Sequence, residues 1–225
     1  MAVKRHSRRF IYVLAAVALV NFVAHLLVYP SLPEQVPTHW GASGAADGYG
    51  PRYMALVLAA LPFLFLLLFR VIPSIDPRRE GYERSWGVWR GFVCGFSLYM
   101  MAFSWVTEAT VFGRIPEGSG LVGSLTFAGL GVLFVALGNY MPRVRQNYTF
   151  GVKTPWALAD EHNWDRTQRM GGIVSVVWGA AMLALALFAG ALGGELLVGL
   201  FVALILGGTA WLYLYSYLVF VGRLR

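Results

Sequence analysis

Residues 53–72 read YMALVLAALPFLFLLLFRVI, an apolar run in which Arg70 is the only charged residue. A helix rises about 1.5 Å per residue, so about 20 apolar residues span the hydrocarbon core of a bilayer. Five further runs of comparable length occur, at residues 10–29, 88–111, 121–141, 171–192 and 196–221. The sequence therefore predicts an all-α, polytopic membrane helix bundle with six transmembrane helices.

The composition supports lipid as the natural solvent. Hydrophobic residues make up 58% of the 225 positions and charged residues 13%, whereas soluble domains contain about 25% charged residues. Cys94 is the only cysteine, which excludes a disulfide framework or a cysteine-rich metal site. The run at 10–29 exceeds the apolar segment of about 7 to 15 residues in a secretory signal, so we interpret it as a retained anchor.

The positive charges predict an orientation. If the N-terminus is cytoplasmic, all 18 Lys and Arg residues except Arg52 and Arg114 fall on the cytoplasmic side. We expect the protein in the cytoplasmic membrane. Because positively charged loops stay on the cytoplasmic side, both termini are expected in the cytoplasm. The net charge of +7 is then explained by topology and by attraction to anionic membrane lipid, without a direct nucleic-acid partner.

Two units are expected along the chain. Residues 1–72 form a two-helix unit with an outer loop rich in Pro and Gly at 30–52, and residues 73–225 form a four-helix unit with a cytoplasmic loop at 142–170. Small residues at four-residue spacing, which let helices approach closely in lipid, predict helix packing within the chain, with a dimer interface as the alternative. These residues are Gly87, Gly91 and Gly95 in one run and Gly199, Ala203 and Gly207 in another.

The two loops carry most of the chemistry outside the spans. The outer loop is turn-rich and contains His39, Trp40 and Asp47. In the inner loop, Thr154 followed by Pro155 suits an N-cap and first helical position, so a short interfacial helix is expected there.

These loops resemble a known family. Asn139-Tyr140-Met141-Pro142, together with residues 147–172, is similar to the signature of the sporulation-delay immunity protein (SdpI) family. The loop at 33–52 and its flanking spans resemble the N-terminal domain of uncharacterised function that accompanies this family. The resemblance implies a bacterial integral membrane protein. The best-understood member of the family protects the producing cell from an exported toxic peptide. When the toxin is present, that member also holds an autorepressor at the membrane.

An outer binding site is predicted from the cost of ionisable groups in a membrane. His25 and Glu108 lie at similar depth in two spans, where such groups usually face a partner or water. We expect them to meet beneath the outer loop; separate hydration near the interface is the alternative. The predicted outer site comprises His25, His39, Trp40, Asp47 and Glu108. A metal site built from the two histidines, Asp47 and Glu108 has weaker support, because nothing in their spacing enforces coordination.

The inner loop is predicted to bind a cytoplasmic partner, in addition to anchoring at the interface. Its aromatic and basic side chains are types that dominate binding hot spots. The predicted residues are Asn147, Lys153, Thr154, Trp156, Trp164, Arg166 and Arg169.

Nucleotide, zinc and nucleophile motifs are missing from the sequence. We therefore expect no cofactor, no catalytic residues and a non-enzymatic immunity and signalling role, with an extracellular toxin peptide and a cytoplasmic repressor as partners. The alternative is a small ion- or solute-coupled transporter or a membrane enzyme that uses the outer His, Glu and Asp residues.

Overall fold

The computed structural model describes the chain except residues 1–8, 42–43, 190, 193 and 225. Within the described part, six helices are long and apolar enough to cross a membrane, as the sequence predicts. They are α1 (Arg9–Val28), α2 (Tyr53–Ile75), α4 (Trp86–Phe103), α6 (Leu121–Tyr140), α8 (Glu161–Phe188) and α9 (Gly194–Phe220). The short elements are η1 (Tyr29–Ser31), β1 (Gln35–Trp40), β2 (Ala46–Pro51), α3 (Arg79–Arg84), α5 (Val106–Val111), η2 (Met141–Arg143) and α7 (Pro155–Ala159).

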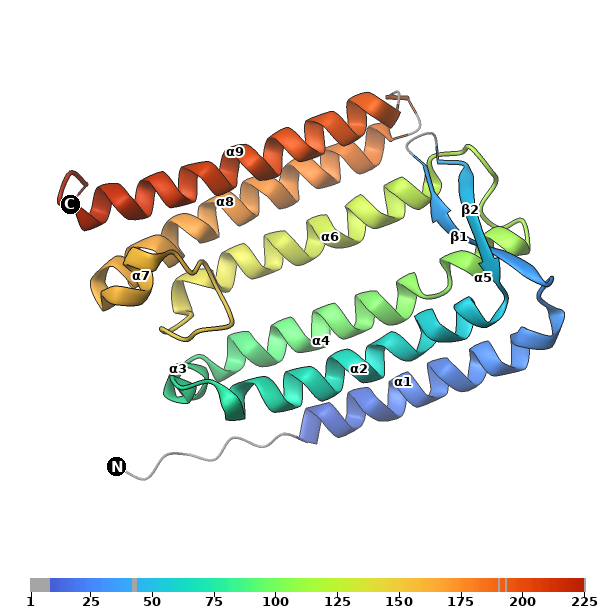
Figure 1. The fold of residues 1–225 in the computed structure, drawn as a ribbon, viewed down its shortest axis with the longest axis horizontal. Coiled ribbons are helices and arrows are strands. Elements are labelled where there is room, and N and C mark those ends of the chain that lie inside the picture. Colours follow the sequence, from blue (N-terminus) through green and yellow to red (C-terminus); the bar gives the residue numbers. More distant parts are fainter. Residues whose placement is uncertain (1–8, 42–43, 190, 193, 225) are drawn as a thin grey trace.

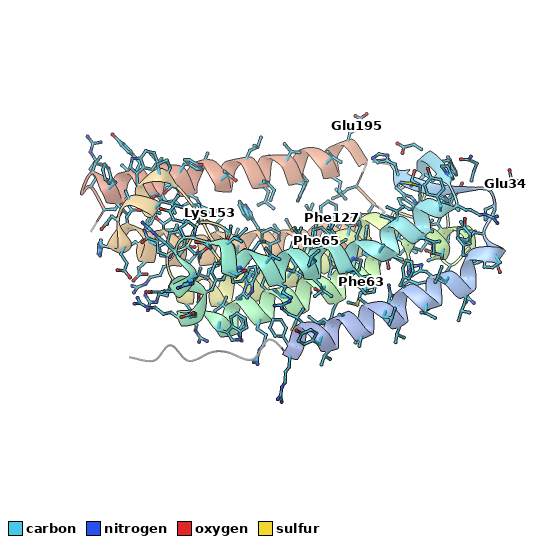
Figure 2. All side chains as sticks on the ribbon, turned by 60° about the horizontal axis from the view of Figure 1, so that its bottom comes forward. Glu34, Phe63, Phe65, Phe127, Lys153 and Glu195 are labelled. Carbon is cyan, nitrogen blue, oxygen red and sulfur yellow. The ribbon has the colours of Figure 1, made fainter. Side chains whose placement is uncertain are left out.

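The long helices lie roughly parallel in a bundle with two distinct ends (Figure 1). Strands β1 and β2 and helix α5 cover one end, which we call the hairpin end. Helices α3 and α7 lie at the other, which we call the α7 end, together with the start of α1 and the close of α9. Figure 2 labels Lys153 near the α7 end and Glu34 and Glu195 near the hairpin end.

Glycine brings α6 and α8 into backbone contact. A methyl group at Gly138 would lie 2.6 Å from the carbonyl oxygen of Gly172, and one at Gly179 would lie 2.6 Å from that of Gly131. Side chains at these positions would force the helices apart, which is how small residues permit close packing in lipid. The α6–α8 pair therefore forms the tightest seam of the C-terminal half.

The glycines predicted to pack within the chain do not do so at most positions. A methyl group at Gly87, Gly91, Gly199 or Gly207 would meet nothing within 4 Å, and only Gly95 has a near neighbour, the side chain of Leu133 at 3.0 Å. That expectation was wrong because four-residue spacing places glycines on one helix face but does not determine what the face meets. Instead, α4 packs against α2 through aromatic side chains, including an edge-to-face contact between Phe69 and Trp89 at 5.7 Å.

The outer loop forms a β-hairpin that the sequence analysis expected only as a turn-rich loop. Strand β1 pairs antiparallel with β2, from Gln35 opposite Pro51 to Trp40 opposite Ala46. Val36 is fully buried and packs in a cluster with Leu32 and Ala55. This contact fixes the hairpin to the ends of α1 and α2.

Helix α8 begins at Glu161, ten residues before the predicted span at 171–192. Its N-cap is Asp160, whose carboxylate accepts a hydrogen bond from the backbone N–H of Asn163 at 2.7 Å. Hydropathy underestimates this helix because its first ten residues are mostly polar. Several of those polar side chains are buried within the protein.

Candidate functional site

The site at the hairpin end begins with a break in the third span. The sequence predicts one helix over 88–111, but α4 ends at Phe103 and α5 begins at Val106. At the break, the Ser104 hydroxyl donates to the carbonyl oxygen of Met101 at 2.7 Å. The break turns Ser104, Trp105 and Glu108 toward α1, where Asn21 and His25 lie.

His25 and Glu108 meet in the interior, as expected from their depth. His25 Nδ1 lies 2.5 Å from Glu108 Oε1, and the two residues are 0% and 1% exposed. His25 Nε2 lies 3.0 Å from Ser104 Oγ. Because the Ser104 hydroxyl donates to Met101, its oxygen can accept from Nε2, and a hydrogen bond joins Nδ1 to Oε1. A histidine and a carboxylate that are each other's partner can be buried together, whereas either alone would be left without compensation.

Aromatic and amide groups complete this buried cluster. The ring of Trp105 stacks on that of His25 with centroids 3.9 Å apart. Its indole N–H donates to Asn21 Oδ1 at 2.8 Å, and Asn21 Nδ2 donates to Ser104 Oγ at 3.3 Å. The second carboxylate oxygen of Glu108 is buried without a hydrogen-bond partner among the described residues. This oxygen of Glu108 can therefore accept a further hydrogen bond inside the cluster.

The hairpin is hydrogen-bonded to the element that carries Glu108. The Thr107 hydroxyl in α5 donates to the carbonyl oxygen of Pro37 in β1 at 3.2 Å. Trp40 packs against a cluster of Val106, Ile115 and Val122, and its indole N–H has no partner in the described part of the chain. The position of the hairpin and the geometry around Glu108 are therefore connected by direct contacts.

His39 and Asp47 form a second pair, on the surface of the hairpin. Nδ1 and Oδ1 are 2.5 Å apart, and the side chains are 73% and 53% exposed. The structure thus places the predicted outer residues at one end of the molecule, four of them as two separate pairs and Trp40 in neither pair. In the described ranges, no three His, Cys, Asp or Glu side chains lie close enough to hold a metal ion, so the geometry gives the metal alternative no support.

The inner loop at the α7 end is organised by buried polar side chains. Asn147, 1% exposed, donates to the carbonyl oxygens of Arg145 and Phe150 and accepts from the backbone N–H groups of Thr149 and Phe150. Asp76 accepts from the N–H of Tyr148 at 2.9 Å and from the Thr149 hydroxyl at 3.0 Å. Amide and carboxylate groups thus hold the loop in one shape.

Tyr82 joins this arrangement from α3, with its hydroxyl hydrogen-bonded to that of Thr149. Burial raises the pKa of the Tyr82 hydroxyl, and the negative charge of Asp76 raises it further. Neither Asp76 nor Tyr82 could be identified from the sequence, because their role depends on contacts about 70 residues away along the chain.

A second polar network joins α7, α8 and α9. Thr154 is the N-cap of α7, as predicted, and accepts from the N–H of Ala157 at 3.1 Å. The Ser216 hydroxyl donates to Asn163 Oδ1 at 2.8 Å, so Thr154 donates to Ser216 across their 2.5 Å contact. Asn163 Nδ2 donates to the Ser216 carbonyl oxygen at 2.9 Å. This network anchors the loop to the last helix.

Trp164 lies in the interior, which corrects the expectation that it anchors the loop at the membrane surface. It is 0% exposed, and its indole N–H donates to the carbonyl oxygen of Val144 at 2.8 Å. A tryptophan whose only polar atom has a protein partner can be buried completely. Asn147 and Thr154 are also buried, so three of the seven predicted partner residues shape the loop from within.

The other four predicted partner residues reach the surface to different degrees. Lys153 and Arg169 are exposed, and Lys153 Nζ donates to the carbonyl oxygen of Thr149 at 2.9 Å. The half-buried Trp156 ring lies 5.3 Å from that of Tyr217, and Arg166 Nη2 lies 3.5 Å from the Tyr215 hydroxyl. A basic and aromatic surface therefore remains at the α7 end.

Comparisons with known proteins confirm the resemblance drawn from the two loops. Residues 143–217 match the SdpI/YfhL protein family, and residues 16–66 match a domain of unknown function, DUF1648. The chain is homologous to Immunity protein SdpI of Bacillus subtilis (strain 168), with 23% identity over 174 residues, 77% of this chain and 80% of that protein. An uncharacterized protein of Archaeoglobus fulgidus is 42% identical over 62 residues, which cover 28% of this chain and 30% of that protein. No solved structure matches.

Six spanning helices and this homology identify a multi-pass protein of a bacterial cytoplasmic membrane. The two matched segments contain different parts of the candidate sites. His25, His39 and Asp47 lie in the N-terminal match, and the polar inner loop lies in the C-terminal one. Ser104, Trp105 and Glu108 lie between them, so the buried pair joins a matched segment to an unmatched one.

Proposed function

We propose that this protein is a membrane immunity protein that makes the cell resistant to an exported toxic peptide. The homology to Immunity protein SdpI along 77% of the chain carries the proposal. The proposed role is non-enzymatic, because the hydroxyl group beside His25, that of Ser104, is buried and donates to the carbonyl oxygen of Met101. The two-unit division at residue 72 is part of this proposal, with the N-terminal unit supplying the hairpin.

The proposal requires the hairpin end to face outward. Arg78, Arg79, Arg143 and Arg145 belong to elements at the α7 end or adjoin them, which favours that end as cytoplasmic. Cysteines introduced singly at Ser119 and at Ala159, in a Cys94→Ser background, test this. An impermeant thiol reagent should label Ser119→Cys in intact cells and should not label Ala159→Cys. The reverse pattern would contradict the orientation.

At the outer site, the exposed His39–Asp47 pair and Trp40 would contact the peptide. The buried His25–Glu108 pair would hold the hairpin in its binding position through α5, because Thr107 connects α5 to Pro37. His39→Ala should reduce survival under toxin, and Glu108→Gln should do so without removing folded protein from the membrane. Thr110→Ala, which removes a hydroxyl bonded only within α5 at 2.9 Å, serves as the control. Full resistance in both site variants would refute the outer site.

At the α7 end, the surface formed by Lys153, Trp156, Arg166 and Arg169 would recruit a cytoplasmic repressor. Trp156→Ala combined with Arg169→Ala should reduce the membrane-bound fraction of a fluorescent candidate repressor when toxin is present. Arg223→Ala removes a positive charge from the loop after α9 and is the matched control. Equal recruitment by the double variant and the control would leave the loop as a lipid-interface anchor.

A proton-coupled transporter is the second candidate, and one observation favours it. His25 and Glu108 are in direct contact inside the bundle, beside an unpartnered carboxylate oxygen, and intramembrane His and Glu residues of this kind occur in proton relays. Liposomes that contain the purified protein and a pH-sensitive dye test this function. Proton flux above that of protein-free liposomes, abolished by Glu108→Gln, would favour transport over immunity.

A further inference from the structure

A long apolar groove runs between α4 and α6. Its part near the α7 end has a volume of about 410 Å³, and a further part of about 570 Å³ continues toward the hairpin end. Gly95 and Leu133 line both parts, so the two parts adjoin along the helix pair, and the Leu133 side chain narrows the groove where they meet.

The floor of the groove on α4 is made by glycine. A methyl group at Gly87 or Gly91 would meet no atom within 4 Å, so the groove is open above both positions. The facing wall on α6 contributes Ala136 and Leu137. An apolar chain lying along this groove would contact helix backbone at the two glycines, as closely packed groups in lipid do.

Positive charge is concentrated at the mouth of the groove. Arg84, which ends α3, and Arg143, which ends η2, line the part near the α7 end, where Ser85 and Tyr140 add hydroxyl groups. Among the described residues that line either part, Asp and Glu are absent. The carboxylate nearest to Arg84 is the exposed Glu80, at 4.0 Å, and Arg143 lies over the Tyr140 ring at 5.2 Å. Exposed ion pairs of this length contribute little, so both guanidinium groups are available to an anion.

We propose that this groove binds one anionic phospholipid. Its phosphate lies between Arg84 and Arg143, and one acyl chain lies along Gly87 and Gly91. Charge complementarity selects the headgroup, because guanidinium groups bind phosphate oxygens in pairs. The apolar walls select the chain, and they exclude an extended peptide, whose backbone N–H and C=O groups would remain unsatisfied. Arg84 precedes α4 and Arg143 follows α6, so the lipid connects the two helices at their ends near α7.

Native mass spectrometry of the full chain, purified from mixed micelles with equal phosphatidylglycerol and phosphatidylcholine, tests the site. The unmodified protein should retain one phosphatidylglycerol in preference to phosphatidylcholine. Arg84→Gln and Arg143→Gln should each weaken retention about fivefold, the effect of one basic residue at an anionic membrane surface. Arg223→Gln is the matched control for charge at the same end and should retain the lipid.

Gly91→Leu tests the groove without changing charge. Its side chain fits the open space and fills it, so lipid retention should fall while the melting temperature does not. Gly199→Leu, at a glycine of α9 that is equally open but does not line the groove, should retain the lipid. Equal retention of phosphatidylglycerol by Gly91→Leu and Gly199→Leu would overturn the proposal. A Gly91→Leu variant that instead converts a dimer to a monomer, with its lipid content unchanged, would overturn it in favour of a subunit interface.

Discussion

Two histidine–carboxylate pairs at the hairpin end make the same contact in opposite surroundings. In each, the imidazole Nδ1 lies 2.5 Å from a carboxylate oxygen. The side chains of His25 and Glu108 are 0% and 2% exposed, whereas those of His39 and Asp47 are 73% and 53% exposed. Identical local geometry therefore implies different energetics, and the surroundings decide which pair the fold depends on.

The difference follows from solvation. Water screens an exposed pair and solvates either partner when the other is removed, so such pairs contribute about 0 to 1 kcal/mol. A buried pair cannot recover solvation in this way, and removal of one partner leaves the other without compensation. We therefore expect the inner pair to hold the structure together and the outer pair to be free for binding.

The largest expected effect is that of Glu108→Ala. It leaves the buried His25 Nδ1 without its partner, a loss of about 3 to 5 kcal/mol in the free energy of unfolding. Denaturant titration in detergent micelles, followed by circular dichroism, measures it. Glu108→Gln is the control, because an amide can still hydrogen-bond to Nδ1 and should lose less. A loss below about 1 kcal/mol for Glu108→Ala would place the two pairs in the same class.

A smaller effect is expected in the coupling between partners. A double-mutant cycle of His25→Ala and Glu108→Ala should give an interaction energy of about 2 kcal/mol, since the residues are buried and in direct contact. The equivalent cycle on His39 and Asp47 should give about 0.2 to 1 kcal/mol. Equal coupling energies in the two cycles would show that burial does not distinguish the pairs.

The meeting of His25 and Glu108 could be predicted from sequence because the physics is general: ionisable groups at equal depth in lipid need a partner. The six spans were predictable for a similar reason, since their length and composition match the bilayer. Ser104 and Trp105, which complete the cluster, gave no such signal. A break in an apolar helix changes hydropathy very little, and the partners of both residues lie about 80 positions away.

Other features depended on tertiary contacts that local patterns do not contain. The spacing of Gly87 and Gly91 is as regular as that of Gly172 and Gly179, yet only the latter pair touches another helix. Trp164 has the flanking charges of an interfacial residue but is buried, because Val144 supplies an acceptor for its indole N–H. In both cases the neighbour, and not the residue type, determines the role.

Trp105→Phe should have a moderate effect on the buried pair. Phenylalanine keeps an aromatic ring to stack on His25 and removes the indole N–H that donates to Asn21 at 2.8 Å. Loss of one such hydrogen bond costs about 1 kcal/mol, measurable by the same denaturant titration. Phe103→Leu, which changes an aromatic residue of α4 outside this hydrogen-bonded cluster, is the comparison. A loss above about 3 kcal/mol would mean that Trp105 supports the pair by more than this bond.

The smallest expected effect on stability is that of Asp47→Ala. His39 can replace the lost carboxylate with water, so the free energy of unfolding should fall by less than about 1 kcal/mol, and the difference should shrink further in high salt. The same variant should reduce survival under toxin if the exposed pair contacts the peptide, which would separate binding from folding in one side chain. Glu34→Ala, at another acidic position of the hairpin end, controls for the loss of negative charge. A large loss of stability for Asp47→Ala would mean that the hairpin needs this pair to keep its shape, and the functional contrast between the two pairs would then be lost.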